Sequence, residues 1–332
     1  MKLSIIIVNY NVKLMLEQCL YSLERSMQRL PQGSCQVIVV DNNSQDGSIE
    51  YLKPLFNQVT FIANKENLGF AKANNQALRL SDAQYKLLLN PDTLVSEETL
   101  IQVIEFMDAN PEAGAVGVKM IDTHGRFHPE SKRSFPTPWN SLCKMFGISK
   151  LLPNSKIFAR YHLRYLDNDQ IHQVDVLSGA FMMLRDEALQ KCGLLDEAFF
   201  MYGEDIDLSY RIELAGYKNY YHPTTILHYK GESTKKNSIR YVKIFYGAML
   251  IFFRKHYPHY NILFTLIIRI AIIFRALLSS IKRLFLDTNR QGAQQSKEAK
   301  INCLITTQDS IELQFRKMQI TPGPKYQIEI TN

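Results

Sequence analysis

The chain has 332 residues, of which 46% are hydrophobic, and a formal net charge of +7. This composition is sufficient for a sizeable core and excludes disorder over most of the chain, and the charge predicts an anionic partner such as nucleic acid, anionic lipid or a diphosphate ligand. The five cysteines are scattered without CxxC spacing, which indicates neither a disulfide framework nor a zinc site and favours a reducing compartment.

Strand and helix patterns alternate through the first third of the chain. Short apolar runs predict buried strands at 3–8, 36–40, 59–63 and 85–89. Apolar residues at helical spacing predict helices at 12–27, 48–56, 70–80 and 96–109. The first run is too short for the core of a signal peptide. The order predicts an α/β fold with a mostly parallel central sheet flanked by helices.

Polar segments follow three of the predicted strands, at Asn9–Asn11, Asp41–Ser44 and Asn90–Thr93. In parallel sheets ligands bind beyond the carboxyl ends of the strands. We therefore expect these segments, which are far apart in the sequence, to border one crevice.

The pattern becomes less regular from about residue 114. The stretch 124–166 is loop-like. Residues 174–184 alternate like a strand around Ser178-Gly179-Ala180, and 205–215 show helical spacing that Gly216 is well placed to end.

Two aspartates at predicted strand ends are candidate ligand-binding residues. Asp41 could accept a hydrogen bond from a pyrimidine N3–H or a ribose hydroxyl, although Asp41–Ser44 is also typical of a turn. Asp92 could bind the Mg²⁺ or Mn²⁺ that a diphosphate donor requires. The alternative for Asp92 is an Asx-type turn with a proline in its preferred place.

Three carboxylates, Glu204, Asp205 and Asp207, stand at the start of the helix predicted at 205–215. Acidic residues at a helix start can be simple caps favoured by the helix dipole, but three exceed what capping requires. Direct displacement at a sugar needs a base that takes the acceptor proton. We expect Asp205 to be that base and Glu204 to orient the acceptor or a metal.

His228 ends another apolar run and is a candidate metal ligand, the alternative being a packed, hydrogen-bonded histidine. Lys230, Lys235 and Lys236 follow it. These lysines could meet a diphosphate or form a solvated face.

Taken in order, these segments resemble family 2 of the inverting glycosyltransferases, which have the GT-A, nucleotide-diphospho-sugar transferase fold. The resemblance covers about residues 1–235, and Tyr202–Gly216 followed by His228 is similar to the rhamnosyltransferase-type branch. The segments that carry it are Ser4–Asn11, Val39–Ser48, Asn67–Asn75, Asn90–Asp92, Ser178–Ala180 and Gly203–Leu208.

The resemblance implies a role for individual residues. The implied nucleotide-binding residues are Val8, Asn9, Tyr10, Asp41, Asn67, Gly69, Lys72 and Asn90. The implied catalytic residues are Asp205 and Glu204, the metal ligands Asp92 and His228, and the acceptor-side residues Asp207, Ser178 and Gly179. The family's metal motif is often Asp-x-Asp. Here Asn90-Pro91-Asp92 leaves one carboxylate, and His228 could supply a second protein ligand.

The chain beyond the resemblance is basic and then polar. Residues 251–286 carry six basic and no acidic residues, and their longest apolar run is too short to span a membrane. We expect basic amphipathic helices at 236–287 that lie on anionic lipid, the alternative being a core helix or a dimer contact. A polar linker at 288–300 and a tail at 301–332, to which no function is assigned, complete the chain.

The expected domain is thus a GT-A catalytic domain at 1–235, with a nucleotide-binding half at 1–110 and an acceptor half at 111–235. Its expected activity is transfer of a sugar from dTDP-rhamnose or a UDP-sugar to a lipid-linked or oligosaccharide acceptor, a cell-surface glycan precursor. The expected location is cytoplasmic, peripheral on the inner face of the membrane, without a nucleic-acid partner and with a homodimer possible.

Two rival functions remain open. A sugar nucleotidyltransferase should carry a glycine-rich, lysine-containing loop after the first strand, whereas Asn9-Tyr10-Asn11 has no glycine. A catalytically inactive, membrane-bound sugar-binding or scaffold protein is the other, against which Asp92 and Asp205 argue.

Overall fold

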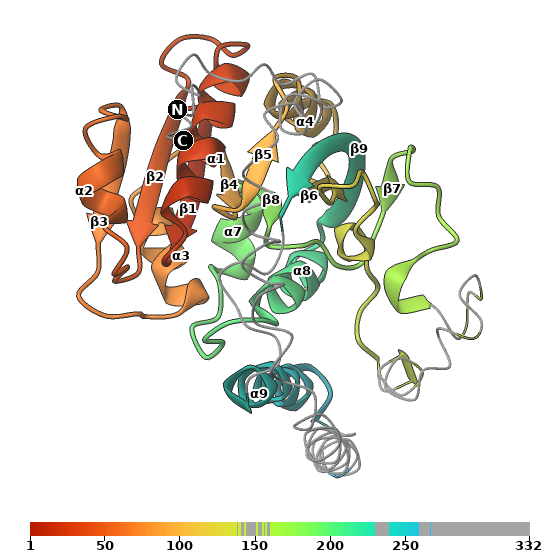
Figure 1. The fold of residues 1–332 in the computed structure, drawn as a ribbon. Coiled ribbons are helices and arrows are strands. Elements are labelled where there is room, and N and C mark those ends of the chain that lie inside the picture. The colour runs from red at the N-terminus through yellow and green to blue at the C-terminus, as the bar shows by residue number, and fades with distance from the viewer. Residues whose placement is uncertain are drawn as a thin grey trace.

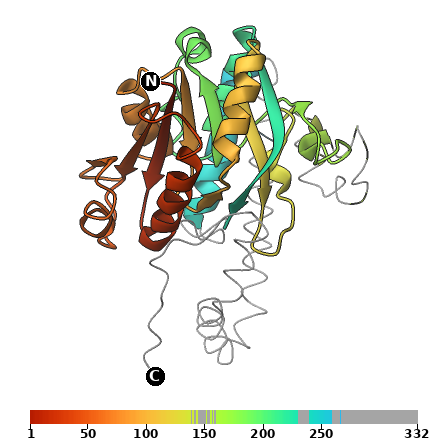
Figure 2. The ribbon, with the colours of Figure 1, turned by 90° about the horizontal axis from the view of Figure 1, so that it is seen from above.

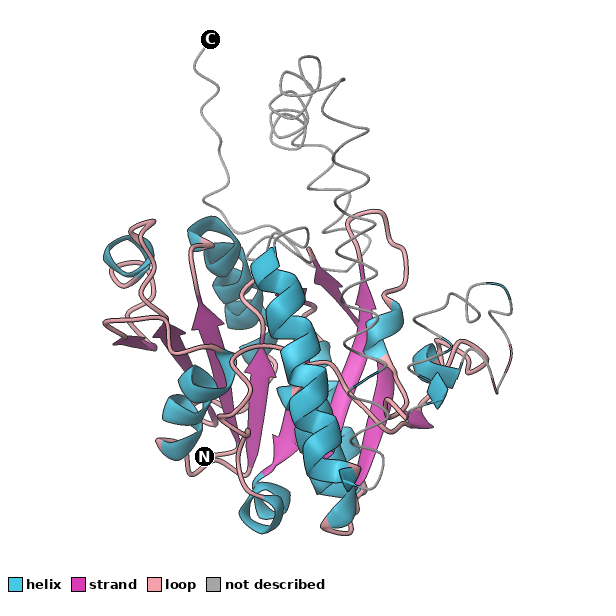
Figure 3. Cartoon of the chain, turned by 90° about the horizontal axis from the view of Figure 1, so that it is seen from below, coloured by secondary structure: helices cyan, strands magenta, loops and turns pink. Residues whose placement is uncertain are grey.

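In a computed structural model of the chain, residues 1–137, 160–229 and 239–258 are described, together with isolated positions between 139 and 157 and at 266. Within these residues one nine-stranded sheet is covered by helices on both faces (Figures 1 and 3). The expected polar linker and tail, and nearly all of the segment after residue 258, lie outside the described residues.

The first half of the sheet is parallel, with the strand order β3-β2-β1-β4. Its strands are β1 (Leu3–Asn9), β2 (Cys35–Asp41), β3 (Val59–Ala63) and β4 (Tyr85–Leu89). The helices of this half are α1 (Lys13–Met27), α2 (Ser48–Leu52), α3 (Phe70–Arg79) and α4 (Thr99–Ala109). All eight expected elements are confirmed. Helix α2 ends earlier than expected, at Leu52, because Pro54 has no backbone N–H with which to continue the helical hydrogen bonds.

The second half of the sheet is mixed. Strand β8 (Phe181–Arg185) is antiparallel to β4 and β6 (Ala113–Ile121), β6 is parallel to β9 (Lys218–His228), and β9 is antiparallel to β5 (Thr93–Val95) and β7 (His172–Gln173). Only the end of the strand expected at 174–184 is regular, because a turn at Ser178 precedes β8, with Phe181 N–H donating to the Ser178 carbonyl at 3.2 Å.

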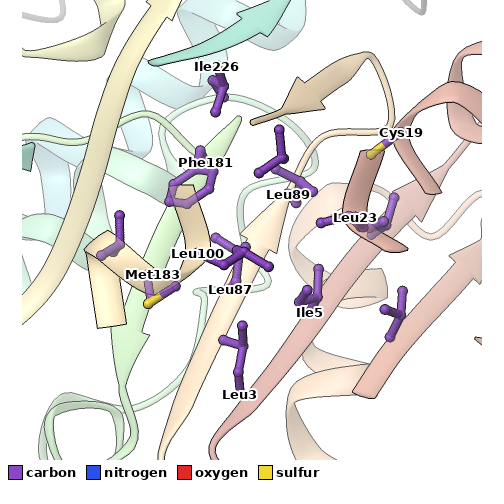
Figure 4. Packing of buried hydrophobic residues seen from close by; sticks show 14 of the residues in the cluster. Leu3, Ile5, Cys19, Leu23, Leu87, Leu89, Leu100, Phe181, Met183 and Ile226 are labelled. Carbon is purple, nitrogen blue, oxygen red and sulfur yellow. The ribbon is translucent and has the colours of Figure 1, made fainter. Parts of the chain in front are cut away.

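The two faces of the sheet bury alternate residues of each strand. Leu3, Ile5 and Ile7 of β1 pack with α1 and α4, which lie on the same face (Figure 2). Figure 4 shows Leu3 and Ile5 with Leu87, Leu89 and Leu23 in this cluster. On the other face, Ile6 and Val8 pack with α3, α7 (Asp186–Cys192) and α8 (Glu204–Leu214). This period-two burial is what a sheet with two covered faces requires.

Helix α9 (Ile239–His256) packs beside α8 (Figure 1). Its buried residues Tyr246, Ala248, Phe252 and Phe253 form a cluster with Phe199, which precedes α8. The start of the expected amphipathic segment is therefore part of the core. In the described part of the chain, no helix has the length and apolar character needed to cross a bilayer.

Replacement of Phe252 by alanine tests this docking of α9. We expect the free energy of unfolding to fall by about 3–5 kcal/mol, because a buried aromatic ring is lost and a cavity remains. Urea denaturation followed by circular dichroism measures the change. Leu214→Ala, at an exposed position of α8, is the control and should change stability by less than about 0.5 kcal/mol. Equal effects of the two substitutions would contradict the packing described.

Candidate active site

The ends of β1 and β2 bring two predicted nucleotide-binding residues together. Asn9 is opposite Asp41 in the parallel register, and its Nδ2 donates to Asp41 Oδ1 at 2.7 Å and to Ser44 Oγ at 3.1 Å. The Ser44 N–H donates to Asp41 Oδ2 at 2.9 Å. Both Asn9 and Asp41 are buried. The Asp41 carboxylate is therefore held in one orientation at the carboxyl edge of the sheet.

The turn at Asn67–Gly69 is fixed against this loop. Asn42 donates to Asn67 Oδ1 at 3.0 Å and to the Gly69 carbonyl at 3.2 Å. Gly69 has a φ of +85°, and a Cβ there would lie 2.5 Å from the Phe200 carbonyl oxygen, which accepts a hydrogen bond from Phe70 N–H at 2.7 Å. Only glycine fits this approach. The turn thus joins the Asp41 loop to the segment that leads into α8.

Two further predicted nucleotide-binding residues, Tyr10 and Lys72, are exposed. Tyr10 follows β1 with 38% of its surface exposed, and Lys72 lies exposed in the first turn of α3. Val8 is buried in β1, where it lies opposite Val40 of β2.

Asp92 and His228 are neighbours, as a shared metal site requires. Thr93 is opposite His228 in the β5–β9 pair, and His228 Nε2 lies 3.2 Å from Asp92 Oδ1. The Tyr229 N–H donates to the Asp92 carbonyl at 2.9 Å. His128 was not predicted. Its Nε2 lies 3.2 Å from the carbonyl oxygen of His228 and fixes the end of β9.

The first turn of α8 carries Glu204, Asp205 and Asp207 after Gly203, which has a φ of +88°. Asp205 Oδ2 accepts from Arg133 Nη2 at 2.6 Å and from Gly179 N–H at 3.4 Å, and 16% of the Asp205 side chain is exposed. Glu204 is buried. Burial and the neighbouring charge of Asp205 raise the pKa of Glu204 to about 8, so its carboxyl group is mostly protonated at neutral pH.

The Ser178–Ala180 turn contacts the Asn90–Asp92 loop, Phe70 of α3 and Asp205. Gly179 donates to Asp205, and Ala180 accepts from Asn90 N–H at 3.0 Å, two residues before Asp92. A Cβ on Gly179 would lie 3.6 Å from the Phe70 ring and 3.7 Å from the Asp205 Cβ. The Asn90–Asp92 loop and the first turn of α8, more than a hundred residues apart in sequence, therefore both bond to this turn.

A family model described as glycosyl transferase family 2 matches residues 4–193, more than half of the chain. The chain belongs to this family. The enzyme is a glycosyltransferase, as the resemblance implied. The matched residues end before α8 and β9, so the roles of Asp205 and His228 rest on geometry and chemistry.

Relatives of this glycosyltransferase include two rhamnosyltransferases. The N-acetylglucosaminyl-diphospho-decaprenol L-rhamnosyltransferase of Mycobacterium tuberculosis is 25% identical over 262 residues, which cover 75% of this chain and 83% of the relative. Rhamnosyltransferase WbbL of Escherichia coli is 30% identical over 164 residues, which cover 47% of this chain and 58% of the relative.

Solved structures confirm the GT-A fold of the enzyme. The mannosyltransferase PcManGT from Pyrobaculum calidifontis, in complex with GDP-Man and Mn²⁺, has a TM-score of 0.53 and 16% identity over 96% of this chain and 84% of that one. Staphylococcus aureus TarS 1-349 in complex with UDP-GlcNAc has a TM-score of 0.51 and 20% identity, and the match covers 76% of this chain and 65% of that one.

Asp207 of the enzyme lies in different surroundings from Asp205. Its carboxylate is fully buried and faces α9, accepting from His256 Nε2 at 2.7 Å and pairing with Lys255 Nζ at 2.8 Å, while Arg211 Nε donates at 2.7 Å. Burial alone would raise the pKa of Asp207, but these bonds outweigh it and lower the pKa to about 2. The geometry favours a role as the anchor of α9 over contact with an acceptor.

Asp207→Asn tests this anchor through pH. The pKa of Asp207 is about 2 when folded and 3.8 ordinarily, so the unfolded chain binds more protons between pH 4 and 2. The stabilisation is present above pH 4, is lost as pH falls toward 2, and amounts to about 2 kcal/mol. We expect Asp207→Asn to lower stability at pH 6 and the difference from wild type to shrink as pH falls. Urea unfolding at pH 6, 4 and 3 measures it, and a pH-independent difference would contradict this assignment.

Proposed function

We propose that this enzyme transfers a sugar from a nucleoside diphosphate sugar to an acceptor hydroxyl with inversion, and that Asp205 is the base. The meeting of the Asp92 loop and Asp205 at the Ser178–Ala180 turn supports this proposal most directly. A sugar held between the two carboxylates would have its diphosphate on one side and the incoming hydroxyl on the other, as in-line displacement requires.

We place the nucleoside on the Asp41 side of the site. Asn9 and Ser44 orient the Asp41 carboxylate toward a donor on the base or ribose. The Asn67–Gly69 turn supplies a rigid wall, and the backbone of Val8–Tyr10 lies at the strand end. Lys72 and Asn90 complete the proposed nucleotide contacts, with Lys72 as the exposed cation.

Asp92 and His228 are the proposed metal ligands. Among the described residues there is no group of three or more histidine, cysteine or acidic side chains that could hold a metal. One carboxylate and one imidazole nevertheless fit Mg²⁺ or Mn²⁺, because these ions commonly complete their shell with substrate phosphates and water. When bound, the cation would neutralise the diphosphate as it leaves.

Asp205 is the proposed acceptor of the hydroxyl proton. As the acceptor oxygen forms its bond to the anomeric carbon, the O–H proton passes to the Asp205 carboxylate, and the carbon–oxygen bond to the diphosphate breaks. Glu204, with its raised pKa, is neutral at pH 7 and does not add a second negative charge near the acceptor. A neutral carboxyl group can instead donate a hydrogen bond, which supports an orienting role.

We further propose dTDP-rhamnose as the donor, with UDP-sugars as the alternative, and a lipid-linked glycan precursor as the acceptor. The names of the two rhamnosyltransferases support the sugar, and the diphospho-decaprenol in one of those names supports a lipid carrier. Such an acceptor would place the enzyme at the cytoplasmic face of the membrane. Because Phe252 and Phe253 are used in packing on α8, contact with anionic lipid would fall to residues beyond 258.

Asp205→Asn is the direct test of the base. We expect turnover to fall by a factor of about 10² to 10⁴, because an amide cannot take the acceptor proton, while donor affinity stays near wild type. Nucleoside diphosphate release measures turnover, and a thermal shift with donor measures binding. Glu187→Gln, at an exposed position of α7, should retain wild-type turnover. Near-normal turnover of Asp205→Asn would remove Asp205 as the base.

The donor and metal can be identified by thermal shift. A true donor at a hundred times its dissociation constant should stabilise the enzyme by about 2.7 kcal/mol, so we expect a raised Tm with dTDP-rhamnose or a UDP-sugar in the presence of Mn²⁺. Asp92→Ala and His228→Ala should lose the Mn²⁺-dependent part of that shift. Retention of the full Mn²⁺-dependent shift in both variants would contradict these ligands.

A further inference from the structure

We infer that Arg133 is the positioning residue of the base. Its guanidinium donates to Asp205 Oδ2, so Oδ1 is the atom that takes the acceptor proton. The same contact holds the Asp205 carboxylate in place relative to the Asn90–Asp92 loop. This inference rests on the proposed function and goes beyond it by assigning a residue of the acceptor half that no motif singled out.

Arg133 is itself held firmly. Its backbone pairs with Val176 in both directions, with N–H to O distances of 3.2 Å and 2.9 Å. Its Nη2 donates to the Leu177 carbonyl at 2.5 Å as well as to Asp205 at 2.6 Å. One guanidinium therefore ties Asp205 to the residue that precedes the Ser178–Ala180 turn.

The two oxygens of Asp205 are used unequally. Oδ2 accepts from Arg133 and from Gly179 N–H, whereas among the described residues Oδ1 accepts from Ile206 N–H alone, at 2.8 Å. Each carboxylate oxygen has two acceptor positions. Oδ2 is thus saturated, and Oδ1 retains one position for the hydroxyl proton of the acceptor.

The charges of the cluster balance around Arg133. The groups that face it are Asp205, Glu204 and Tyr161. Burial opposes the charge of Arg133, but Asp205 and Tyr161 raise its pKa, so the guanidinium stays charged. With Glu204 neutral at pH 7, one cation faces one anion. A buried charge whose partner is removed is costly, so this ion pair holds both side chains in place.

These hydrogen bonds also fix the position of Asp205 relative to the Asn90–Asp92 loop. Arg133 holds Leu177 and Asp205, Gly179 donates to Asp205, and Ala180 accepts from Asn90. Because these bonds run through four consecutive residues of one turn, Asp205 cannot shift relative to the Asn90–Asp92 loop without breaking them. Placement errors of this kind are costly in turnover, since catalysis depends on reactant geometry.

The test compares Arg133→Gln, Arg133→Lys and the control Lys132→Met. The readout is release of dTDP from dTDP-rhamnose, or of UDP from UDP-GlcNAc, whichever the wild type turns over, as a function of pH. In Arg133→Gln we expect kcat to fall by about tenfold or more with the donor KM within about threefold of wild type. The acid limb of kcat should move up by about one pH unit, because a carboxylate that loses its cation takes a proton more readily.

The two other variants separate positioning from folding. Arg133→Lys keeps the charge, so its acid limb should stay at the wild-type pH and part of the lost kcat should return. Lys132 is a buried neighbour whose Nζ donates to the carbonyls of Leu166 at 2.5 Å and Asp167 at 2.9 Å, away from Asp205. Lys132→Met should lower Tm but leave kcat and the acid limb of the folded enzyme unchanged.

Wild-type kcat in Arg133→Gln, or a reduced kcat with an unmoved acid limb, would overturn the inference. If Arg133→Gln does not fold, Arg133→Lys decides: a reduced kcat at unchanged donor KM supports positioning, and wild-type kcat overturns it. If the wild type is active, Asp205→Asn is inactive and Arg133→Gln has wild-type kcat, this inference is refuted and the proposed function stands. A wild type that releases nucleotide from neither donor, or an active Asp205→Asn, would refute the proposed function and this inference with it.

Discussion

The Ser178–Ala180 turn contacts three parts of the site that are remote in sequence. Its amide and carbonyl groups bond to Asp205 and to Asn90, and the Phe70 ring lies beside Gly179. Such backbone bonds are directional, so the turn sets the placement of α8 relative to the Asn90–Asp92 loop. A site assembled in this way depends on one irregular segment between β7 and β8 more than on any single helix.

The parallel half of the fold and the strand-end residues were predictable because their signals are local. Buried parallel strands are continuous β-branched runs, and polar residues directly after them mark the carboxyl edge. The positions of Asn9, Asp41 and Asp92 at this edge were predicted in this way. Asp92 follows one predicted strand and His228 ends another apolar run, so their proximity was also expected. It depends on β5, which has only three residues.

Other features depend on contacts between distant segments and leave no local signal. Strand β6 contains Gly114 and Gly117, which weaken a strand pattern, yet a Cβ on Gly114 would lie 2.6 Å from Ile212. Arg133 stands in a loop-like stretch beside Lys132, and its importance comes only from Val176 and Asp205, which the fold brings to it. The environment of Asp207 likewise depends on α9, which begins after a long gap in sequence.

The burial of Asp207 under α9 decides how much of the chain must be retained in a recombinant fragment. A fragment that stops after β9 would remove Lys255 and His256 from a carboxylate within the protein interior and would uncover the ring of Phe199. Expression of such a fragment would be expected to yield aggregated material. Fragments intended for crystallisation therefore need to extend at least through residue 258, well beyond the end of β9.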